Sequence, residues 1–139
     1  MKAILSLIML VFSLATNALP KIQVFVSFSM PETLLKETLA ESARFKIPAN
    51  LNGLYENSFP ATVKKIMGLS KEIPELNLQI DPTAFERFGI THVPAFVVEK
   101  ENTFDVIYGN LTLKEALTRI KNSGETNLNE KDFKELGLD

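Results

Sequence analysis

Cysteine is absent from this sequence of 139 residues, and histidine occurs only once, at His92. Without a thiol, the chain can form neither a disulfide nor a cysteine-based redox or nucleophilic centre. A metal site needs several ligands, and the sequence shows no cluster of histidine and carboxylate side chains. We therefore expect no disulfide, no metal site, no cofactor and no thiol chemistry.

A dominant charge of one sign is also missing. The sequence has 15 Lys and Arg against 17 Asp and Glu, which gives a formal net charge of −2, and it has no dense basic run. Nucleic-acid binding through a broad electrostatic surface is therefore not expected. A hydrophobic fraction of 45% and a charged fraction of 23% are typical of a globular protein, and the length leaves room for one domain.

The N-terminus has the pattern of a secretory signal peptide. Lys2 precedes an uncharged apolar run from Ala3 to Ala15, and Thr16 and Ala18 are the small residues expected before a cut after Ala18. The run is shorter than the ~20 residues of a membrane span, and an uncleaved anchor is the alternative. We predict a signal peptide over residues 1–18, export to the periplasm, and no stable membrane anchor after cleavage.

Strands and helices are predicted to alternate after the leader. Residues 22–28 alternate and then fill with Val and Phe, as a central strand does. Ser29 with Glu32, and Thr112 with Glu115, have the spacing of helix capping boxes. Further strands are predicted over 50–55, 76–80, 94–98 and 103–108, and further helices start at Ser58 and Asp81.

The spacing of apolar residues predicts the buried face of each helix and part of the core. The faces are Leu34, Leu35, Leu39 and Ala43 in the first helix, Val63, Ile66, Met67 and Ser70 in the second, and Leu113, Ala116, Leu117 and Ile120 in the last. The aromatic residues expected in the core are Phe85, Phe88 and Phe96.

This order of elements resembles a thioredoxin-like fold, which is an α/β class with three α/β/α layers and a mixed central sheet. Such domains carry a Cys-x-x-Cys motif where this sequence has Ser29-Met30-Pro31-Glu32. The resemblance implies that the Val93–Pro94 bond is cis and lies beside that turn. It also assigns residues 19–123 to the domain and leaves 124–139 as an acidic C-terminal tail.

Several segments together resemble the TrbC family of F-type conjugative pilus assembly proteins. They are Phe25-Val-Ser-Phe-Ser-Met-Pro31, Ile80-Asp-Pro82, Phe85-x-x-Phe88 and Val93-Pro94-Ala-Phe-Val97. The resemblance implies an exported periplasmic protein, not an enzyme, that serves a type IV secretion system during conjugation. It would support pilus or pilin assembly through contacts with pilin or other transfer proteins.

The candidate partner-binding surface combines two segments, Ser29, Met30 and Pro31 with His92, Val93 and Pro94. A proline loop of this kind can leave backbone free to pair with an extended peptide. The plainer alternatives are that Ser29 only caps a helix, that Pro94 only shapes a strand entry, and that His92 is a structural hydrogen-bonding residue. No catalytic residue is predicted, because no third residue is placed to orient His92 beside a serine.

Two other functions remain open from the sequence. One is a divergent exported enzyme that uses the scaffold without thiols, and the other is a generic periplasmic peptide-binding domain. The sequence also leaves open whether the tail after Gly124 is ordered. Its apolar residues Phe133, Leu136 and Leu138 could dock on the domain or on a partner.

Overall fold

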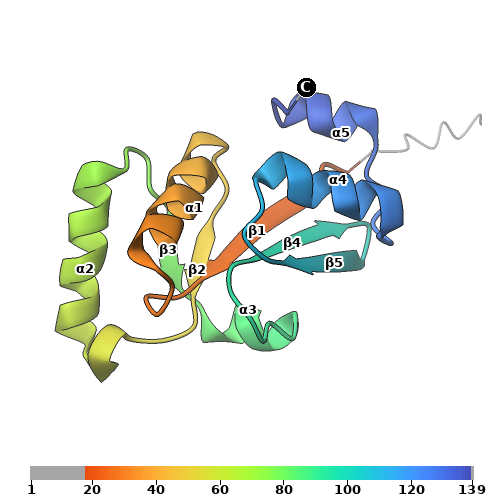
Figure 1. The fold of residues 1–139 in the computed structure, drawn as a ribbon. Helices are drawn as coiled ribbons and strands as arrows, with labels where there is room; N and C mark the ends of the chain where they lie inside the picture. The colour runs from red at the N-terminus through yellow and green to blue at the C-terminus, as the bar shows by residue number, and fades with distance from the viewer. Residues whose placement is uncertain (1–17, 139) are drawn as a thin grey trace, which may run out of the picture.

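The computed structural model describes residues 18–138 (Figure 1). Apart from Ala18, the predicted signal peptide lies outside these residues. Within residues 18–138, no helix has both the length and the apolar character needed to cross a membrane. The elements are β1 (Lys21–Val26), α1 (Glu32–Arg44), β2 (Ala49–Leu51), η1 (Tyr55–Asn57), α2 (Phe59–Glu72), β3 (Leu78–Ile80), α3 (Pro82–Arg87), β4 (Ala95–Lys100), β5 (Thr103–Tyr108), α4 (Leu113–Ser123) and α5 (Glu130–Glu135).

The strands form one mixed sheet in the order β3-β2-β1-β4-β5. β1, β2 and β3 are parallel, whereas β4 runs antiparallel to both β1 and β5. β1 takes the central position because it buries apolar side chains on both faces, Val24 and Val26 on one and Phe25 on the other. The predicted mixed central sheet is confirmed.

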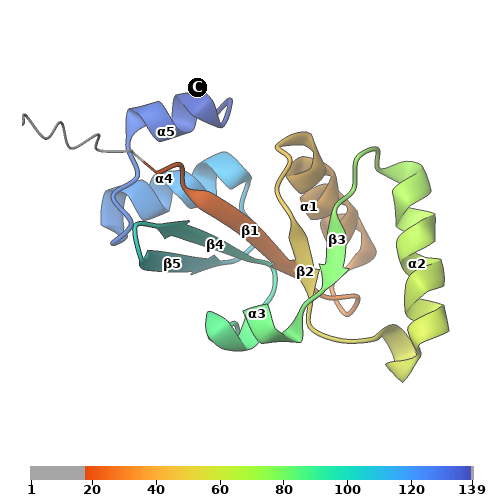
Figure 2. The same ribbon diagram turned by 180° about the vertical axis from the view of Figure 1, so that it is seen from behind.

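Helices cover both faces of the sheet. α1 and α4 pack on the face that carries Val24 and Phe96. α3 packs on the other face, where Phe85 and Phe88 meet the Phe25 ring edge to face at centroid distances of 4.9 and 6.0 Å. The predicted three layers and the predicted aromatic core residues are confirmed. α2 stands at the β3 end of the sheet, and α4 and α5 lie at the opposite end (Figure 1, Figure 2).

A ladder of polar side chains crosses the α3 face of the sheet. Asn50 of β2 is fully buried, donates to Gln23 of β1 at 3.0 Å and accepts from Gln79 of β3 at 2.7 Å. Gln23 also donates to Glu99 of β4 at 3.4 Å, and Arg87 of α3 donates to the other oxygen of Glu99 at 2.6 Å. The ladder favours one strand register, because a slip by one residue would turn these side chains to the other face.

The predicted strands exist, but their ends differ from the prediction. β1 ends at Val26 and β2 at Leu51, because the residues that follow each strand enter turns. β4 extends to Lys100, since it pairs with β5 along the whole length of that strand. Asn102 lies in the β4–β5 turn, as predicted, with a positive φ of 66°.

Helix α4 has the start and the buried face that the sequence predicts. Thr112 Oγ1 accepts a hydrogen bond from Glu115 N at 3.1 Å, and the Glu115 carboxylate accepts one from Thr112 N at 2.9 Å. The second capping box is therefore confirmed. All four predicted inner residues are buried, namely Leu113, Ala116, Leu117 and Ile120.

The segment after Gly124 turns back on the domain. Asp105 of β5 accepts hydrogen bonds from the backbone N–H of Glu125 and from the backbone and hydroxyl of Thr126, at 2.6 to 3.0 Å. Gly124 is required at this turn, because a Cβ there would lie 2.5 Å from Asp105 Oδ2 and 2.6 Å from Ile120 O. The close approach fixes the direction in which the chain leaves α4.

Helix α5 then docks through a buried ion pair. Lys100 Nζ of β4 lies 2.8 Å from Asp132 Oδ2, and both side chains are buried. Phe133 and Leu138 join the same hydrophobic core as α4, and Leu136 packs against it while partly exposed. Of the two possibilities that the sequence left open for these apolar residues, the structure shows docking on the domain.

Helix α2 begins as predicted but presents a different face to the domain. Ser58 caps it by accepting from Ala61 N at 3.2 Å. The predicted inner face was wrong for Val63, Met67 and Ser70, which are exposed, and Ile66 is only half-buried. α2 buries Thr62 and Leu69 instead. The reason is local, because the Thr62 hydroxyl accepts from Tyr55 N at 2.7 Å and donates to Ser58 O at 2.6 Å. These bonds turn the Thr62 side of α2 toward the domain.

Candidate functional site

The loop between β1 and α1 is a tight turn closed by its own side chains. Ser27 O accepts a hydrogen bond from Met30 N at 3.1 Å, and Ser27 Oγ accepts one from Ser29 N at 3.1 Å. The two hydroxyls lie 2.8 Å apart. Met30 points into the hydrophobic core, which anchors the turn, while Ser29 and Pro31 stay exposed.

The predicted capping box of Ser29 and Glu32 is wrong. α1 begins at Glu32, its N-cap residue is Pro31, and no side chain caps it. The Ser29 hydroxyl is instead paired with Ser27, because short polar side chains in a turn often bond to nearby groups and not to a helix end. Glu32 forms an ion pair with Lys36 at 3.1 Å. Capping therefore does not account for Ser29.

The second predicted segment lies beside this turn. The Val93–Pro94 bond is cis, as expected. β1 and β4 pair Phe25 with Ala95 in antiparallel register, so Pro94 lies next to Val26, the last residue of β1. Pro94 is buried and Val93 is half-buried. The sheet thus brings together two segments that are some sixty residues apart in the sequence.

His92 is exposed, and its ring contacts Tyr108 of β5. Its Nδ1 lies 2.9 Å from Thr91 Oγ1, and its ring meets the Tyr108 ring edge to face at a centroid distance of 5.6 Å. The Tyr108 hydroxyl accepts from Thr91 N at 3.3 Å and donates to Gly89 O at 3.2 Å. Among the hydrogen bonds of the described chain, none joins His92 to Ser29, so the two do not form a nucleophile and base pair in this structure.

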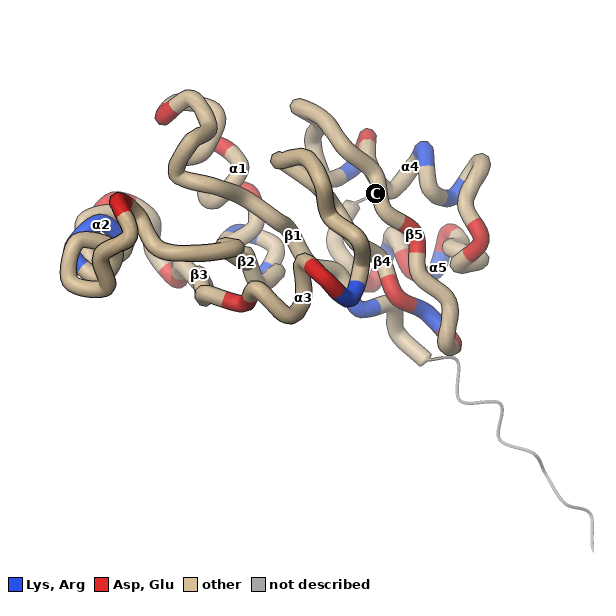
Figure 3. The backbone as a smooth tube through the Cα atoms, turned by 90° about the horizontal axis from the view of Figure 1, so that it is seen from below, with Lys and Arg blue, Asp and Glu red and all other residues tan. Residues whose placement is uncertain are grey.

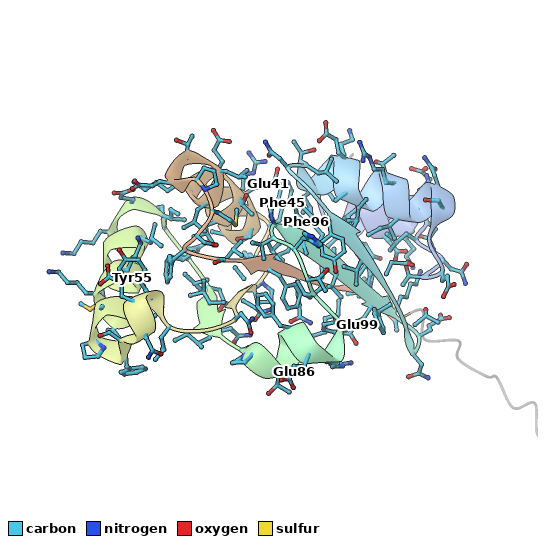
Figure 4. All side chains as sticks on the ribbon, turned by 60° about the horizontal axis from the view of Figure 1, so that its bottom comes forward. Glu41, Phe45, Tyr55, Glu86, Phe96 and Glu99 are labelled. Atoms are coloured by element: carbon cyan, nitrogen blue, oxygen red, sulfur yellow. The ribbon has the colours of Figure 1, made fainter. Side chains whose placement is uncertain are left out.

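A hollow of about 330 Å³ opens beside the turn. Its wall includes two aromatic rings, and Lys65 of the neighbouring hollow lies over one of them, an arrangement that the sequence pattern did not indicate. The rings of Phe28 and Tyr55 meet edge to face at 5.7 Å, and Lys65 Nζ lies 4.0 Å from the Tyr55 centroid. Figure 4 labels Tyr55 beside α2. The hollow is lined by Ser27, Phe28, Ser29, Leu51, Asn52, Gly53, Leu54, Tyr55 and Glu56.

A second hollow, of about 450 Å³, continues from the first between α1 and α2. The two share Phe28 and Tyr55, and we call them together the α1–α2 groove. The second part has an apolar floor that includes Met30, Leu35 and Leu69. Its remaining lining residues are Glu32, Lys36, Ala61, Lys64, Lys65, Gly68 and Glu72. The groove therefore has an apolar floor with charges of both signs at its rim.

Lys36 joins the two helices at this rim. Its Nζ lies 2.9 Å from Glu72 of α2 and 3.1 Å from Glu32 of α1. Hydrogen bonds to Glu72 and then Glu32 raise the pKa of Lys36 above its ordinary value. The ion pairs of Lys36 thus link α1 and α2 across the rim of the groove.

The arrangement is suited to holding a peptide segment. Apolar floors with a few polar groups at the rim are typical of binding clefts, and extended or helical peptides bind such grooves. Within residues 18–138, no group of three or more His, Asp or Glu side chains is placed to hold a metal ion. Of the six predicted site residues, Ser29, Pro31 and His92 offer exposed surface, whereas Met30, Val93 and Pro94 support it.

Comparison with known protein families shows a match over more than half of the chain. Residues 24–120 match the model of a family described as "Type-F conjugative transfer system pilin assembly protein". The curated "Periplasmic protein TrbC" of Escherichia coli (strain K12) is 42% identical over 101 residues, which cover 73% of this chain and 48% of that protein. The chain therefore spans about half the length of that relative.

Comparison with solved structures supports the fold. The crystal structure of the exposed lipoprotein thioredoxin Etrx1 from Streptococcus pneumoniae strain TIGR4 is similar, with a TM-score of 0.53. The match covers 77% of this chain and 87% of the thioredoxin at 13% sequence identity. At this identity the likeness establishes the thioredoxin-like fold and nothing about activity.

Proposed function

Because this chain belongs to the TrbC family of type-F conjugative transfer system pilin assembly proteins, we propose that it supports pilus assembly through protein contacts that need no thiol chemistry. It is a periplasmic protein, like its curated TrbC relative. Its partners are pilin or other conjugative transfer proteins. They bind at the α1–α2 groove and at the neighbouring turn with Ser29 and Pro31.

The groove beside the β1–α1 turn is the observation that carries this proposal. Thioredoxin-like domains use this turn for cysteine chemistry, and this chain has no cysteine in its 139 residues. What remains at the turn is an exposed serine, a proline and an adjoining groove with an apolar floor. Such a surface can recognise a peptide by contact alone.

The first test is deletion of the encoding gene in a conjugating donor strain. We expect loss of both DNA transfer and extracellular pili, each restored by the intact gene. Normal transfer together with normal pili in the deletion strain would contradict the assembly role.

The second test separates groove binding from other modes of action. Asn52 is exposed in the wall of the groove, so Asn52→Trp should block it without disturbing the core. We expect the variant to bind its partner with a Kd about tenfold higher or more, which corresponds to ~1.4 kcal/mol of binding free energy. Transfer and piliation should fall as a result. Asn122→Trp, on the exposed side of α4, is the matched control. Equal activity of the two variants, at equal melting temperature, would place the binding surface elsewhere.

A further inference from the structure

The side of α2 that faces away from the domain is unusually apolar. Phe59, Val63 and Met67 follow one another at intervals of one helical turn, and their side chains are 62%, 36% and 59% exposed. They line a shallow depression of about 630 Å³, together with Pro60, Lys64, Gly68 and Lys71. We call the surface formed by Phe59, Val63, Met67 and Lys71 the outer face of α2. None of these four residues lines the α1–α2 groove.

Phe59, Val63 and Met67 have the spacing of a helix face that is normally buried. Amphipathic helices normally turn such a row toward a core, yet α2 buries Thr62 and Leu69 and leaves the row in solvent. A contiguous exposed apolar patch on a folded domain commonly marks an interaction site. Within residues 18–138, no segment covers it, and α2 is the outermost element at that end of the sheet (Figure 1, Figure 2).

Gly68 lies in the middle of α2, between the outer face and the groove. Glycine in a helix interior is unfavourable relative to alanine. No close packing inside the domain explains it, because a Cβ at Gly68 would have no neighbouring atom within 4 Å. A bare stretch of helix backbone beside exposed apolar side chains allows another helix to approach closely.

The charges around the outer face are of one sign. Lys64 and Lys71 lie in the depression, no acidic residue lines it, and neither lysine takes part in an ion pair of the described chain. The one glutamate of α2, Glu72, is paired with Lys36 of α1. Figure 3 shows blue Lys segments on α2, which carries three lysines and one glutamate although the whole chain has a net charge of −2.

From these observations we propose that the outer face of α2 docks an amphipathic helix of a partner protein, whose apolar side is flanked by carboxylates. The partner's apolar residues cover Phe59 and Met67, its carboxylates meet Lys64 and Lys71, and Gly68 allows the two helices to lie close together. A second copy of this chain is the wrong partner. A symmetric α2–α2 contact would set these lysines against themselves, and like charges in an interface are unfavourable.

This surface shares Lys64 and Gly68 with the lining of the groove of the proposed function, but Phe59, Val63, Met67 and Lys71 line the outer depression alone, so variants at these four positions test it separately. The test uses the full chain in conjugating cells, with a photo-crosslinking amino acid at Phe59 or Met67 and, as control, at the exposed α4 residue Asn122. We expect adducts from the two α2 positions to one protein, absent from the control. Mass spectrometry should place the crosslinked residue in a segment with helical apolar spacing and flanking Asp or Glu.

Substitutions on the outer face of α2 provide a second part of the test. Lys71→Glu should reduce the adduct from position 67 by about fivefold or more, while Lys71→Arg should keep it, because the contact depends on charge sign. Gly68→Ala should also weaken the adduct although it raises the melting temperature. A merely structural role for Gly68 would not weaken binding while increasing stability.

Four outcomes would overturn the proposal. The first is adducts from the α2 positions that are no stronger than those from position 122, and the second is adducts to a second copy of this chain. The third is an adduct that Lys71→Glu leaves unchanged. The fourth is binding of the chain to phosphatidylglycerol vesicles through Met67 with no adduct to any protein. Loss of pili in the deletion strain together with any of these would leave the assembly role standing and remove only the α2 contact.

Discussion

Helices α2 and α4 share a pattern of residues, a capped start and an apolar stripe, and differ in what covers the stripe. Each begins with a hydroxyl side chain that caps its first turn, and each has an apolar stripe at helical spacing. The stripe of α4 is buried against the sheet, and the C-terminal segment with Phe133 and Leu138 joins the same core. The stripe of α2 lies in solvent, while a threonine and a leucine face the domain.

The comparison shows that an apolar stripe on a helix indicates a surface that another segment covers. The stripe does not indicate whether that segment belongs to the same chain or to a partner. In α4 the same chain provides the cover. In α2 the bonds of Thr62 to Tyr55 and Ser58 turn the stripe outward, and we infer that another protein covers it. The following predictions test this difference, from the largest expected effect to the smallest.

Removing the anchor of the C-terminal segment should have the largest effect. Asp132→Ala leaves the buried Lys100 without its carboxylate partner and only the carbonyl oxygen of Asn127 to bond, and breaking a buried ion pair costs about 3–5 kcal/mol of unfolding free energy. Urea denaturation of the purified chain measures it. Glu135→Ala, which removes an exposed ion pair with Lys131, is the control and should change stability by under about 0.5 kcal/mol. Equal small changes would mean that the ion pair does not hold α5 on the domain.

Truncating one residue in each stripe tests the comparison directly. Leu117→Ala in α4 should cost about 2–5 kcal/mol, because its side chain is fully buried. Met67→Ala in α2 should change stability by no more than about 0.5 kcal/mol, since Met67 is mostly exposed. Denaturation of both variants under the same conditions decides it. A large loss for Met67→Ala would show that its side chain packs within the domain.

Removing the N-cap side chain should destabilise α2 and α4 by similar amounts, although truncations in their apolar stripes should not. Ser58→Ala removes the bond to Ala61 N, and Thr112→Ala removes the bond to Glu115 N. Each should cost about 0.5–2 kcal/mol of unfolding free energy. Thermal unfolding followed by circular dichroism measures both. If only the α4 variant is destabilised, the two helices differ in their starts as well as in their cover.

The smallest effect should be a gain in stability. Gly68→Ala should stabilise the isolated chain by up to about 1 kcal/mol, because alanine favours the helix and the added Cβ meets open space. A rise of a few degrees in melting temperature would report it. Gly124→Ala is the contrasting control and should destabilise, since its Cβ would collide with Asp105. A loss of stability for Gly68→Ala would point to an unseen structural role of that glycine.

Much of the fold could be predicted from local patterns. The Thr112 capping box, the Asp81 cap, the β4–β5 hairpin and the buried face of α4 depend on residues a few positions apart. The candidate site was predicted in part. The segments with Ser29 and Pro94 do meet, but the α1–α2 groove was missed, because Phe28 comes from the β1–α1 loop, which is far in the sequence from η1 with Tyr55 and α2 with Lys65.

The Ser29 capping box failed for a reason that the spacing alone does not contain. Ser27 offers the Ser29 hydroxyl a partner two residues away, and Pro31 takes the N-cap position. The inner face of α2 failed in the same way, since Thr62 found its partners in the preceding turn. Both errors arose where a polar side chain had more than one possible hydrogen-bond partner.

The sequence by itself determined the absence of thiol chemistry, the alternation of strands and helices, and the residues that resemble the TrbC family. Only the tertiary structure decided which side of α2 faces the domain, where the groove opens, and that Lys100 and Asp132 join β4 to α5. The physical reason is the sequence separation of the residues that interact. Caps and periodicity are set by neighbours along the chain, whereas burial and ion pairing depend on residues that meet only after the sheet has formed.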